Sequence, residues 1–223
     1  MKFTEEEIHK IYNEHVKLPE EYFLKYTNVP DISKNWLYAD YPRIPSLLDF
    51  KEWSNKYNLT NVENLCSTAI NDPELTLIKY KNLTHMSYPK YDLHTYYEEF
   101  KESFDLFIFC QTLEHLYNPI TSLENINKYL KAGGYVFTSV PTLNIPHMTP
   151  IHYGGFTPMG LAMLFVQSDF EIIEMGQWGN FKYIERLFRT YSWPSYNELN
   201  ENNIIHNEEQ NVCQCWILAR KKI

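Results

Sequence analysis

The stretch SFDLFIFCQTLEHLYNPITSLENINKYLKAGGYVFTSVP, residues 103–141, decides the fold. It opens with an apolar run, SFDLFIFC, of the kind that forms a parallel strand buried on both faces. A helix is predicted to start at Pro119 and to end at Gly133 and Gly134. A second apolar run, YVFTSV, then stops at Pro141. Strand, helix and strand in this order predict a unit of a mostly parallel sheet.

The flanking sequence extends the same alternation. Short strands are predicted at 61–67 and 82–88 before this stretch, and at 170–175 and 212–222 after it, with a further helix that starts at Thr157. We therefore expect an α/β fold with a doubly wound, mostly parallel sheet. The first 60 residues carry helical patterns instead, and they predict an N-terminal helical cap packed on the same domain, with the sheet domain over residues 61–223.

Length and charge exclude several classes of protein. The chain has 223 residues and a net charge of −8, which suits one domain and argues against a nucleic-acid partner. No apolar run approaches the length of a membrane span, and the acidic start MKFTEEEIHK is unlike a secretory signal. Four cysteines are too few for a disulfide scaffold. These features predict a cytoplasmic protein with no membrane partner, and they leave the oligomeric state open.

The distribution of glycine restricts the cofactor loop. All seven glycines lie at or after Gly133. A GxGxxG dinucleotide fingerprint and a Walker P-loop are therefore absent from the N-terminal half, where nucleotide-binding α/β folds carry them. Any cofactor loop in this half must work without glycine.

Several co-linear motifs carry a family resemblance. They are Phe104-Asp105, Leu113-Glu114-His115, Leu130-Lys131-Ala132-Gly133-Gly134, Pro141, His152, Phe156-Thr157 and the strand FEIIEM. In order and spacing, the chain resembles the class I S-adenosylmethionine-dependent methyltransferases of the small-molecule type (type 11/23-like) over about residues 60–222. The resemblance implies a Rossmann-like, seven-stranded sheet with an antiparallel last strand, and S-adenosyl-L-methionine as cofactor.

The resemblance also points to the residues around the cofactor. The family's glycine-rich loop would fall at 66–71, where Ser, Thr and Ala are the small residues. Asp72 would cap a helix that starts at Pro73 and could pair with the ammonium of the cofactor, and Asp92 is the nearest substitute for the usual ribose-binding acid. The predicted cofactor-binding residues are Cys66, Ser67, Thr68, Asp72, Ser87, Tyr88, Asp92, Leu93, Gln111, Thr112 and Leu113.

Two histidines are the candidate catalytic residues. His147 and His152 lie in the loop that follows the strand ending at Pro141, where α/β sheets place their ligands. Imidazole suits proton acceptance near neutral pH, and His147 is the preferred base. The alternative for His152 is a tether between this loop and the next helix, and His115 is interpreted as structural. A divalent ion at these histidines is a further alternative, but no metal ligand is assigned.

Aromatic residues suggest how an acceptor would bind. Seven aromatics lie within 178–197, and they could form a lid that stacks on a sugar ring or another flat acceptor. Tyr153 and Trp178 are the predicted substrate residues. The alternative is that this segment packs in the core.

These features together predict the activity. We expect an O-methyltransferase that acts on a hydroxyl of a sugar, a glycan or another small molecule. The sequence segments HYGGFTPMGLAM and GQWGN also resemble small methyltransferases that cap sugars in bacterial surface-polysaccharide pathways and large DNA viruses. The alternatives are an inactive, methyltransferase-like binding subunit that lost its cofactor with the glycines, and a small-molecule N-methyltransferase.

Overall fold

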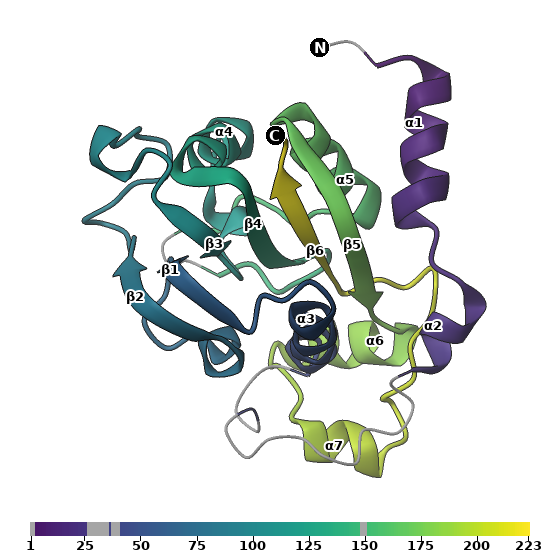
Figure 1. Ribbon diagram of the computed structural model, residues 1–223. Helices are drawn as coiled ribbons and strands as arrows, with labels where there is room; N and C mark the ends of the chain where they lie inside the picture. Colours follow the sequence, from purple (N-terminus) through teal and green to yellow (C-terminus); the bar gives the residue numbers. More distant parts are fainter. Residues whose placement is uncertain (1–2, 26–35, 37–40, 148–150) are drawn as a thin grey trace.

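A single mixed sheet forms the centre of the molecule (Figure 1). The computed structural model describes residues 3–25, 36, 41–147 and 151–223. Six strands lie side by side in the order β2-β1-β3-β4-β6-β5. Their bounds are β1 (Asn61–Ser67), β2 (Lys79–His85), β3 (Phe104–Ile108), β4 (Leu130–Pro141), β5 (Phe170–Trp178) and β6 (Gln214–Lys221). The strands from β2 to β4 are parallel, and β6 is antiparallel to both of its neighbours.

The sheet confirms the predicted α/β class and the antiparallel last strand, but not the predicted number of strands. Six strands are present in the described ranges, against the seven that the resemblance implies. The segment between β2 and β3, residues 86–103, contains one 3-10 turn, Glu98–Phe100, and no strand. One strand-helix unit is therefore shortened to a loop at this edge of the sheet.

Side chains alternate between the two faces of the sheet, as period-2 strand geometry requires. In β3, Phe107 belongs to one apolar cluster while Leu106 and Ile108 belong to the other. In β6, Ile217 belongs to the same cluster as Phe107, and Trp216 belongs to the other cluster. Both faces are thus buried, which explains why the two apolar runs of residues 103–141 show no polar alternation.

Helices cover each of these faces. The helices α4 (Pro119–Tyr129) and α5 (Pro158–Gln167) contribute Leu123 and Phe165 to one cluster. On the other face lie α3 (Arg43–Lys56), α6 (Phe181–Thr190) and α7 (Tyr196–Glu201). The ring of Phe50 in α3 stacks on that of Phe137 in β4 at a centroid distance of 4.1 Å. None of the helices in the described ranges is both long and apolar enough to cross a membrane.

The end of α4 differs from the prediction. The helix stops at Tyr129, and the chain enters β4 at Leu130 instead of continuing to the two glycines. Gly133 has a φ of +74°, and a Cβ on Gly134 would lie 3.1 Å from the carbonyl oxygen of Phe104. The glycines therefore allow β4 to approach β3 closely, and they do not end the helix.

The described N-terminal residues are helical. They form α1 (Glu5–Ile11), whose Thr4–Glu7 capping box is present, a π-helical turn (Tyr12–Val16) and α2 (Glu20–Leu24). Helix α3 starts at Arg43, and no side-chain hydrogen bond caps its N-terminus. Asp49 of α3 is buried and accepts a hydrogen bond from Trp216 Nε1 at 2.9 Å. This helix is consequently part of the core of the sheet.

Candidate functional site

A cavity opens at the carboxyl ends of β1, β2 and β3. The chain leaves β1 toward β2 on one side and returns to β3 on the other, so the gap between β1 and β3 is the switch point of the sheet, where such folds bind ligands. The cavity has a volume of about 560 Å³. Its lining residues are Arg43, Thr68, Ala69, Asp72, Met86, Ser87, Tyr88, Tyr91, Asp92, Leu93, His94, Cys110, Gln111, Thr112, His115, Leu116, Tyr117, Ile151 and Tyr153.

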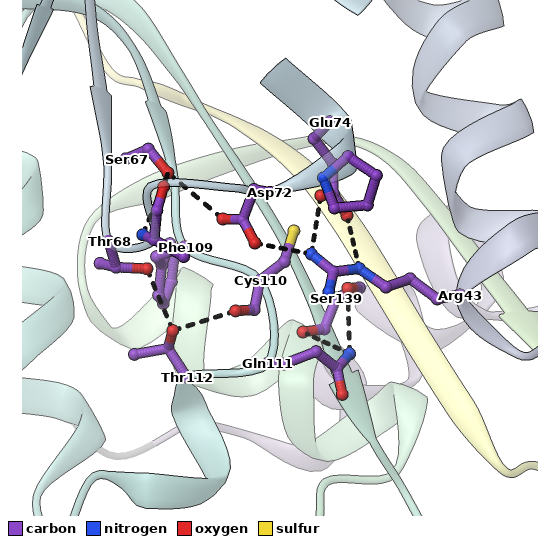
Figure 2. Close-up of polar contacts among 12 residues, drawn as sticks. Arg43, Ser67, Thr68, Asp72, Glu74, Phe109, Cys110, Gln111, Thr112 and Ser139 are labelled. Atoms are coloured by element: carbon purple, nitrogen blue, oxygen red, sulfur yellow. Dashed lines mark hydrogen bonds and ion pairs between the residues drawn. The ribbon is translucent and has the colours of Figure 1, made fainter. Parts of the chain in front are cut away.

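Hydroxyl groups hold the glycine-free loop after β1 in place (Figure 2). Ser87 Oγ donates to the carbonyl oxygen of Thr68 at 2.8 Å, and Ser67 Oγ accepts from the N–H of Ala69 at 3.2 Å. Thr112 donates to the carbonyl oxygen of Cys110, which leaves Thr68 Oγ1 to donate to Thr112 Oγ1 at 3.1 Å. The last bond ties the β1 loop to the β3 loop across the cavity.

The helix predicted after this loop is a single turn. Residues Pro73–Leu77 form a 3-10 helix of five residues, and the side chain of Asp72 makes no capping hydrogen bond to it. The prediction of a helix that starts at Pro73 and is capped by Asp72 is therefore wrong. Asp72 instead directs its carboxylate to Arg43 and Ser67.

A buried ion cluster closes one end of the cavity. Arg43 Nη2 lies 2.8 Å from Asp72 Oδ1 and 2.7 Å from Glu74 Oε2, and its Nε donates to Glu74 Oε1 at 3.2 Å (Figure 2). Glu74 is fully buried and Asp72 is 6% exposed. Burial and the neighbouring Glu74 raise the pKa of Asp72 to about 6, against the opposing effect of Arg43. With one cation and two carboxyl groups, the cluster favours cationic ligands at this end.

Sequence reasoning missed Arg43. It comes from the first turn of α3, and its two partners follow 29 and 31 residues later. Neither periodicity nor a motif links these positions in the sequence. The one available signal was a charged residue within the predicted N-terminal helical cap, which is too common to identify a site.

Another part of the cavity lining combines an acid with aromatic rings. His94 donates to Asp92 Oδ1 from its backbone N–H at 2.9 Å and from its Nδ1 at 2.7 Å. Burial raises the pKa of Asp92, but these two contacts outweigh it, so the net effect lowers the pKa and keeps the carboxylate charged. The ring of His94 stacks on Tyr117 at 3.8 Å. A charged carboxylate next to a flat aromatic face suits a nucleoside.

The end of β3 has an unusual backbone. Gln111 has a φ of +50°, in the left-handed region that side chains rarely adopt. Its N–H donates to the carbonyl oxygen of Ser139 at 2.8 Å, and its Nε2 lies 3.2 Å from Ser139 Oγ. These bonds to β4 hold Gln111 at the cavity wall, and strained positions of this kind cluster at functional sites.

Three histidines gather next to the cavity, and one of them lines it. His115 follows β3, while His147 and His152 lie in the loop after β4. The Nε2 atoms of His115 and His147 are 3.3 Å apart, and the ring centroids of His147 and His152 are 4.7 Å apart. Of the three, His115 lines the cavity. The predicted catalytic residues His147 and His152 thus lie behind a histidine that we interpreted as structural.

Burial affects the titration of this group. It lowers the pKa of His115, and the neighbouring His147 acts in the same direction. The pKa of His152 is lowered by burial and by both other histidines. Glu114, which is 1% exposed, has a pKa raised to about 7 by burial. Among the residues that the structure describes, no set of three or more His, Cys, Asp or Glu side chains is arranged to hold a metal ion.

Most of the predicted cofactor residues surround this cavity. The lining includes Thr68, Asp72, Ser87, Tyr88, Asp92, Leu93, Gln111 and Thr112. The side chains of Cys66 and Leu113 belong instead to the apolar core, and the buried Ser67 supports the loop from below. Sequence patterns locate strand ends well, but they do not tell which of two adjacent side chains faces the ligand.

The two predicted substrate residues lie in different parts of the structure. Tyr153 lines the cavity and is 56% exposed. Trp178 is fully buried, packs against Tyr41 and Tyr183, and donates from Nε1 to the carbonyl oxygen of Ile205 at 3.3 Å. Trp178 is therefore a core residue, and its prediction as a lid residue is wrong.

A comparison with family models matches residues 58–138 to the family described as a methyltransferase domain. The match spans β1 to most of β4, which are the strands that build the cavity. The matched segment is about a third of the chain and resembles this family. Together with the shared fold, the match supports an S-adenosylmethionine-dependent methyltransferase with S-adenosylmethionine as its cofactor. A search of curated proteins found no significant match.

Solved structures share the fold at low identity. The chain is similar to the 1,6-didemethyltoxoflavin-N1-methyltransferase of Burkholderia thailandensis, with a TM-score of 0.52, 13% identity and coverage of 80% of this chain and 79% of that one. The chain is also similar to the cyclase SpnF, with a TM-score of 0.51 and 13% identity, and the match covers 80% of this chain and 82% of that one. Phosphoethanolamine N-methyltransferase 2 of Haemonchus contortus gives 0.50 and 12%, and the match covers 80% of this chain but 52% of that one. At such identities the likeness shows the fold alone.

The residues around the cavity fit the cofactor. A volume of about 560 Å³ lies in the range of small-molecule sites. The lining offers hydroxyl and amide groups near β1 and β3, and two carboxyl groups against one guanidinium. S-adenosylmethionine carries a sulfonium, an ammonium and one carboxylate, so its net positive charge matches this excess of carboxyl groups. In place of glycine, the loop has Ser67, whose hydroxyl bonds within the loop, and Thr68, whose hydroxyl bonds to Thr112.

Proposed function

We propose that this methyltransferase transfers the methyl group to a hydroxyl of a sugar, a glycan or another small molecule. One observation carries the proposal: a histidine and three exposed tyrosines lie around a single cavity. Tyr88, Tyr117 and Tyr153 are 67%, 65% and 56% exposed, and all three line the cavity together with His115. Exposed aromatic rings stack on sugar faces, and a nearby imidazole can take a hydroxyl proton.

The cofactor would lie along the carboxyl ends of the strands. In this proposal Asp92 accepts hydrogen bonds from the ribose hydroxyls, with the ring of His94 beside it. The methionine end would then meet Gln111, Thr112 and the negative cluster around Asp72. When bound, the cofactor supplies an electrophilic methyl group on a cationic sulfur.

The role proposed for Asp72 differs from that expected from the sequence. Its Oδ1 bonds to Arg43 and its Oδ2 lies 3.2 Å from Ser67 Oγ, so both oxygens already have partners. A direct ion pair with an ammonium would have to share them. We assign Asp72 an indirect role, in which it fixes Arg43 and contributes negative charge to that end of the cavity.

The acceptor would enter from the tyrosine side. Tyr153 is held by its backbone N–H, which donates to the carbonyl oxygen of Glu114 at 2.8 Å, while its ring stays exposed. Tyr117 and Tyr153 approach edge to face at 6.4 Å. These rings can position a flat or ring-shaped acceptor beside the histidines. The net charge of −8 continues to disfavour polyanionic acceptors such as nucleic acids.

Matched acceptors test the proposal. The protein is incubated with S-adenosylmethionine carrying a radioactive methyl group and with pairs of methyl glycosides that differ at one position, hydroxyl or amine. We expect label in the hydroxyl compounds, as methyl ethers identified by mass spectrometry. Label in the amines alone would overturn the O-methyl assignment in favour of N-methylation. Calorimetry provides the independent control, with a Kd for the cofactor of about 100 µM or lower, equivalent to about −5.5 kcal/mol.

A further inference from the structure

Two histidine nitrogens face each other without an obvious hydrogen between them. His115 Nδ1 lies 2.9 Å from the carbonyl oxygen of Ile151, and His147 Nδ1 lies 3.0 Å from that of Ile145. A carbonyl oxygen can only accept, so each Nδ1 carries the ring hydrogen in the neutral imidazole. Both Nε2 atoms then present a lone pair, and they lie 3.3 Å apart.

This arrangement binds one added proton well and a second one poorly. Two opposed lone pairs repel each other until one of them is protonated, when the contact becomes an N–H···N hydrogen bond. Protonation of both rings would place two cations in contact at a partly buried position. The pair therefore accepts one proton and resists the next, as closely coupled sites do.

Other groups that face the pair leave this conclusion intact. Glu114 Oε1 lies 3.9 Å from His115 Nε2, and burial holds its pKa at about 7. Its Oε2 has no hydrogen-bond partner in the described part of the chain. His152 approaches from the loop after β4, and its pKa is lowered by burial and by both neighbours. Trp193 packs edge-on against His147 and adds no charge.

We propose that His115 is the catalytic base of the methyl transfer and that His147 is its positioning partner, with the two Nε2 atoms sharing the proton removed from the acceptor. Of the two rings, His115 is the one that lines the cavity, so we place the acceptor hydroxyl on the His115 side of the contact between the two Nε2 atoms. This inference rests on the proposed O-methyl transfer. It reverses the roles expected from the sequence, in which His147 was the base and His115 was structural.

The step balances as an in-line displacement. The hydroxyl oxygen gives an electron pair to the methyl carbon, and the carbon–sulfur bond breaks with its pair on sulfur. The hydroxyl proton moves to Nε2 of His115. The products are the methyl ether, S-adenosylhomocysteine and a singly protonated histidine pair, which later releases its proton to solvent.

Proton uptake by the pair is measured without any acceptor. In protein labelled with ¹³C and ¹⁵N in histidine, NMR titration between pH 8 and 5 should show His115 and His147 changing together with the uptake of one proton. In His147→Phe, His115 should titrate alone. Independent uptake of one proton by each ring would overturn the shared site. Tight Zn²⁺ binding by the wild type in native mass spectrometry, lost in His115→Ala, would also overturn it and indicate a metal site.

Kinetics then separates the two roles. With a hydroxyl acceptor identified in the methyl glycoside assay, His115→Ala should lower kcat by about 10²- to 10⁴-fold, the usual range for loss of a general base. His147→Phe should lower kcat by less, and it should shift the acidic limb of the pH profile. In His147→Gln, the amide N–H would donate a permanent hydrogen bond to His115, so this variant should not restore the wild-type kcat. The exposed His9→Gln is the control for loss of a histidine.

Failure of the base assignment and failure of the proposed function would give different results. Unchanged kcat in His115→Ala, with the hydroxyl still methylated, would overturn the base assignment alone. Transfer to amines only would overturn the proposed function, while the NMR result would still decide whether the pair shares a proton. Calorimetry of cofactor binding by each variant confirms that the cavity remains folded.

Discussion

The guanidinium of Arg43 and the carboxylate of Asp72 join the first helix of the core to the cofactor loop, with Nη2 and Oδ1 2.8 Å apart. Arg43 belongs to α3, outside the matched methyltransferase segment, while Asp72 follows β1 within it. Glu74 binds the same guanidinium from the 3-10 turn. The shape of the cavity at this end therefore depends on an N-terminal helix that the family match does not include.

Replacement of Arg43 should destabilise the fold. Arg43→Met keeps much of the side-chain volume but leaves Asp72 and the fully buried Glu74 without their cation. Loss of one partner of a buried ion pair costs about 3–5 kcal/mol, which urea unfolding would measure. Arg220→Met removes an exposed pair with Glu171 and should cost less than about 1 kcal/mol. Equal losses in the two variants would contradict a structural role for the cluster.

Protonation of Glu114 should make stability depend on pH. Its pKa is about 7 in the fold against an ordinary 4.5, so the folded state binds this proton more tightly than the unfolded state does. The free energy of unfolding should therefore fall as the pH rises from about 4.5 to about 7, by about 3 kcal/mol from this group. Asp72 acts in the same direction, whereas the lowered pKa values of His115 and His152 act in the opposite one.

A neutral isostere isolates that contribution. Glu114→Gln should be more stable than the wild type above pH 7, and its unfolding free energy should vary less between pH 4.5 and 7. Glu124→Gln, at an exposed position of α4, is the matched control and should follow the wild-type curve. Parallel curves for Glu114→Gln and the wild type would show that this carboxyl group titrates normally in the fold.

The sequence predicted the parts of the fold that local patterns determine. The apolar run at 103–110 became β3, the Thr157 cap opens α5, and NVENLCS has the bounds of β1. Local patterns failed where a distant contact decides. The helix before Gly133 ended early because β4 pairs with β3 from Leu130 onward.

The site shows the same limit more strongly. Strand ends predicted where the cavity would lie, because parallel strands bring their carboxyl ends to one edge. They did not predict that Trp178 points into the core, since an aromatic-rich segment has the same composition in a lid and in a core. Nor did they place His115 in front of His147, because this order depends on how two loops from different strands pack together.

The carboxylate of Asp92 should contribute to cofactor affinity. We propose that it binds the ribose, and the His94 contacts keep it charged. Asp92→Asn should raise the Kd for S-adenosylmethionine by about 10-fold in calorimetry, the equivalent of a charge-assisted hydrogen bond. Asp169→Asn, at an exposed position after α5, removes the same charge elsewhere and should leave the Kd unchanged. Wild-type affinity in Asp92→Asn would exclude this carboxylate from the ribose site.

The exposed ring of Tyr153 should affect acceptor binding more than chemistry. Aromatic stacking contributes about 0.5–1.5 kcal/mol, so Tyr153→Ala should raise the KM for a glycoside acceptor by about 2- to 12-fold with kcat little changed. Because the side chain is 56% exposed, its loss should alter unfolding by less than about 0.5 kcal/mol. Tyr80→Ala, at a 40% exposed position on β2 that does not line the cavity, is the control. A fall in kcat at constant KM would show instead that Tyr153 takes part in the chemical step.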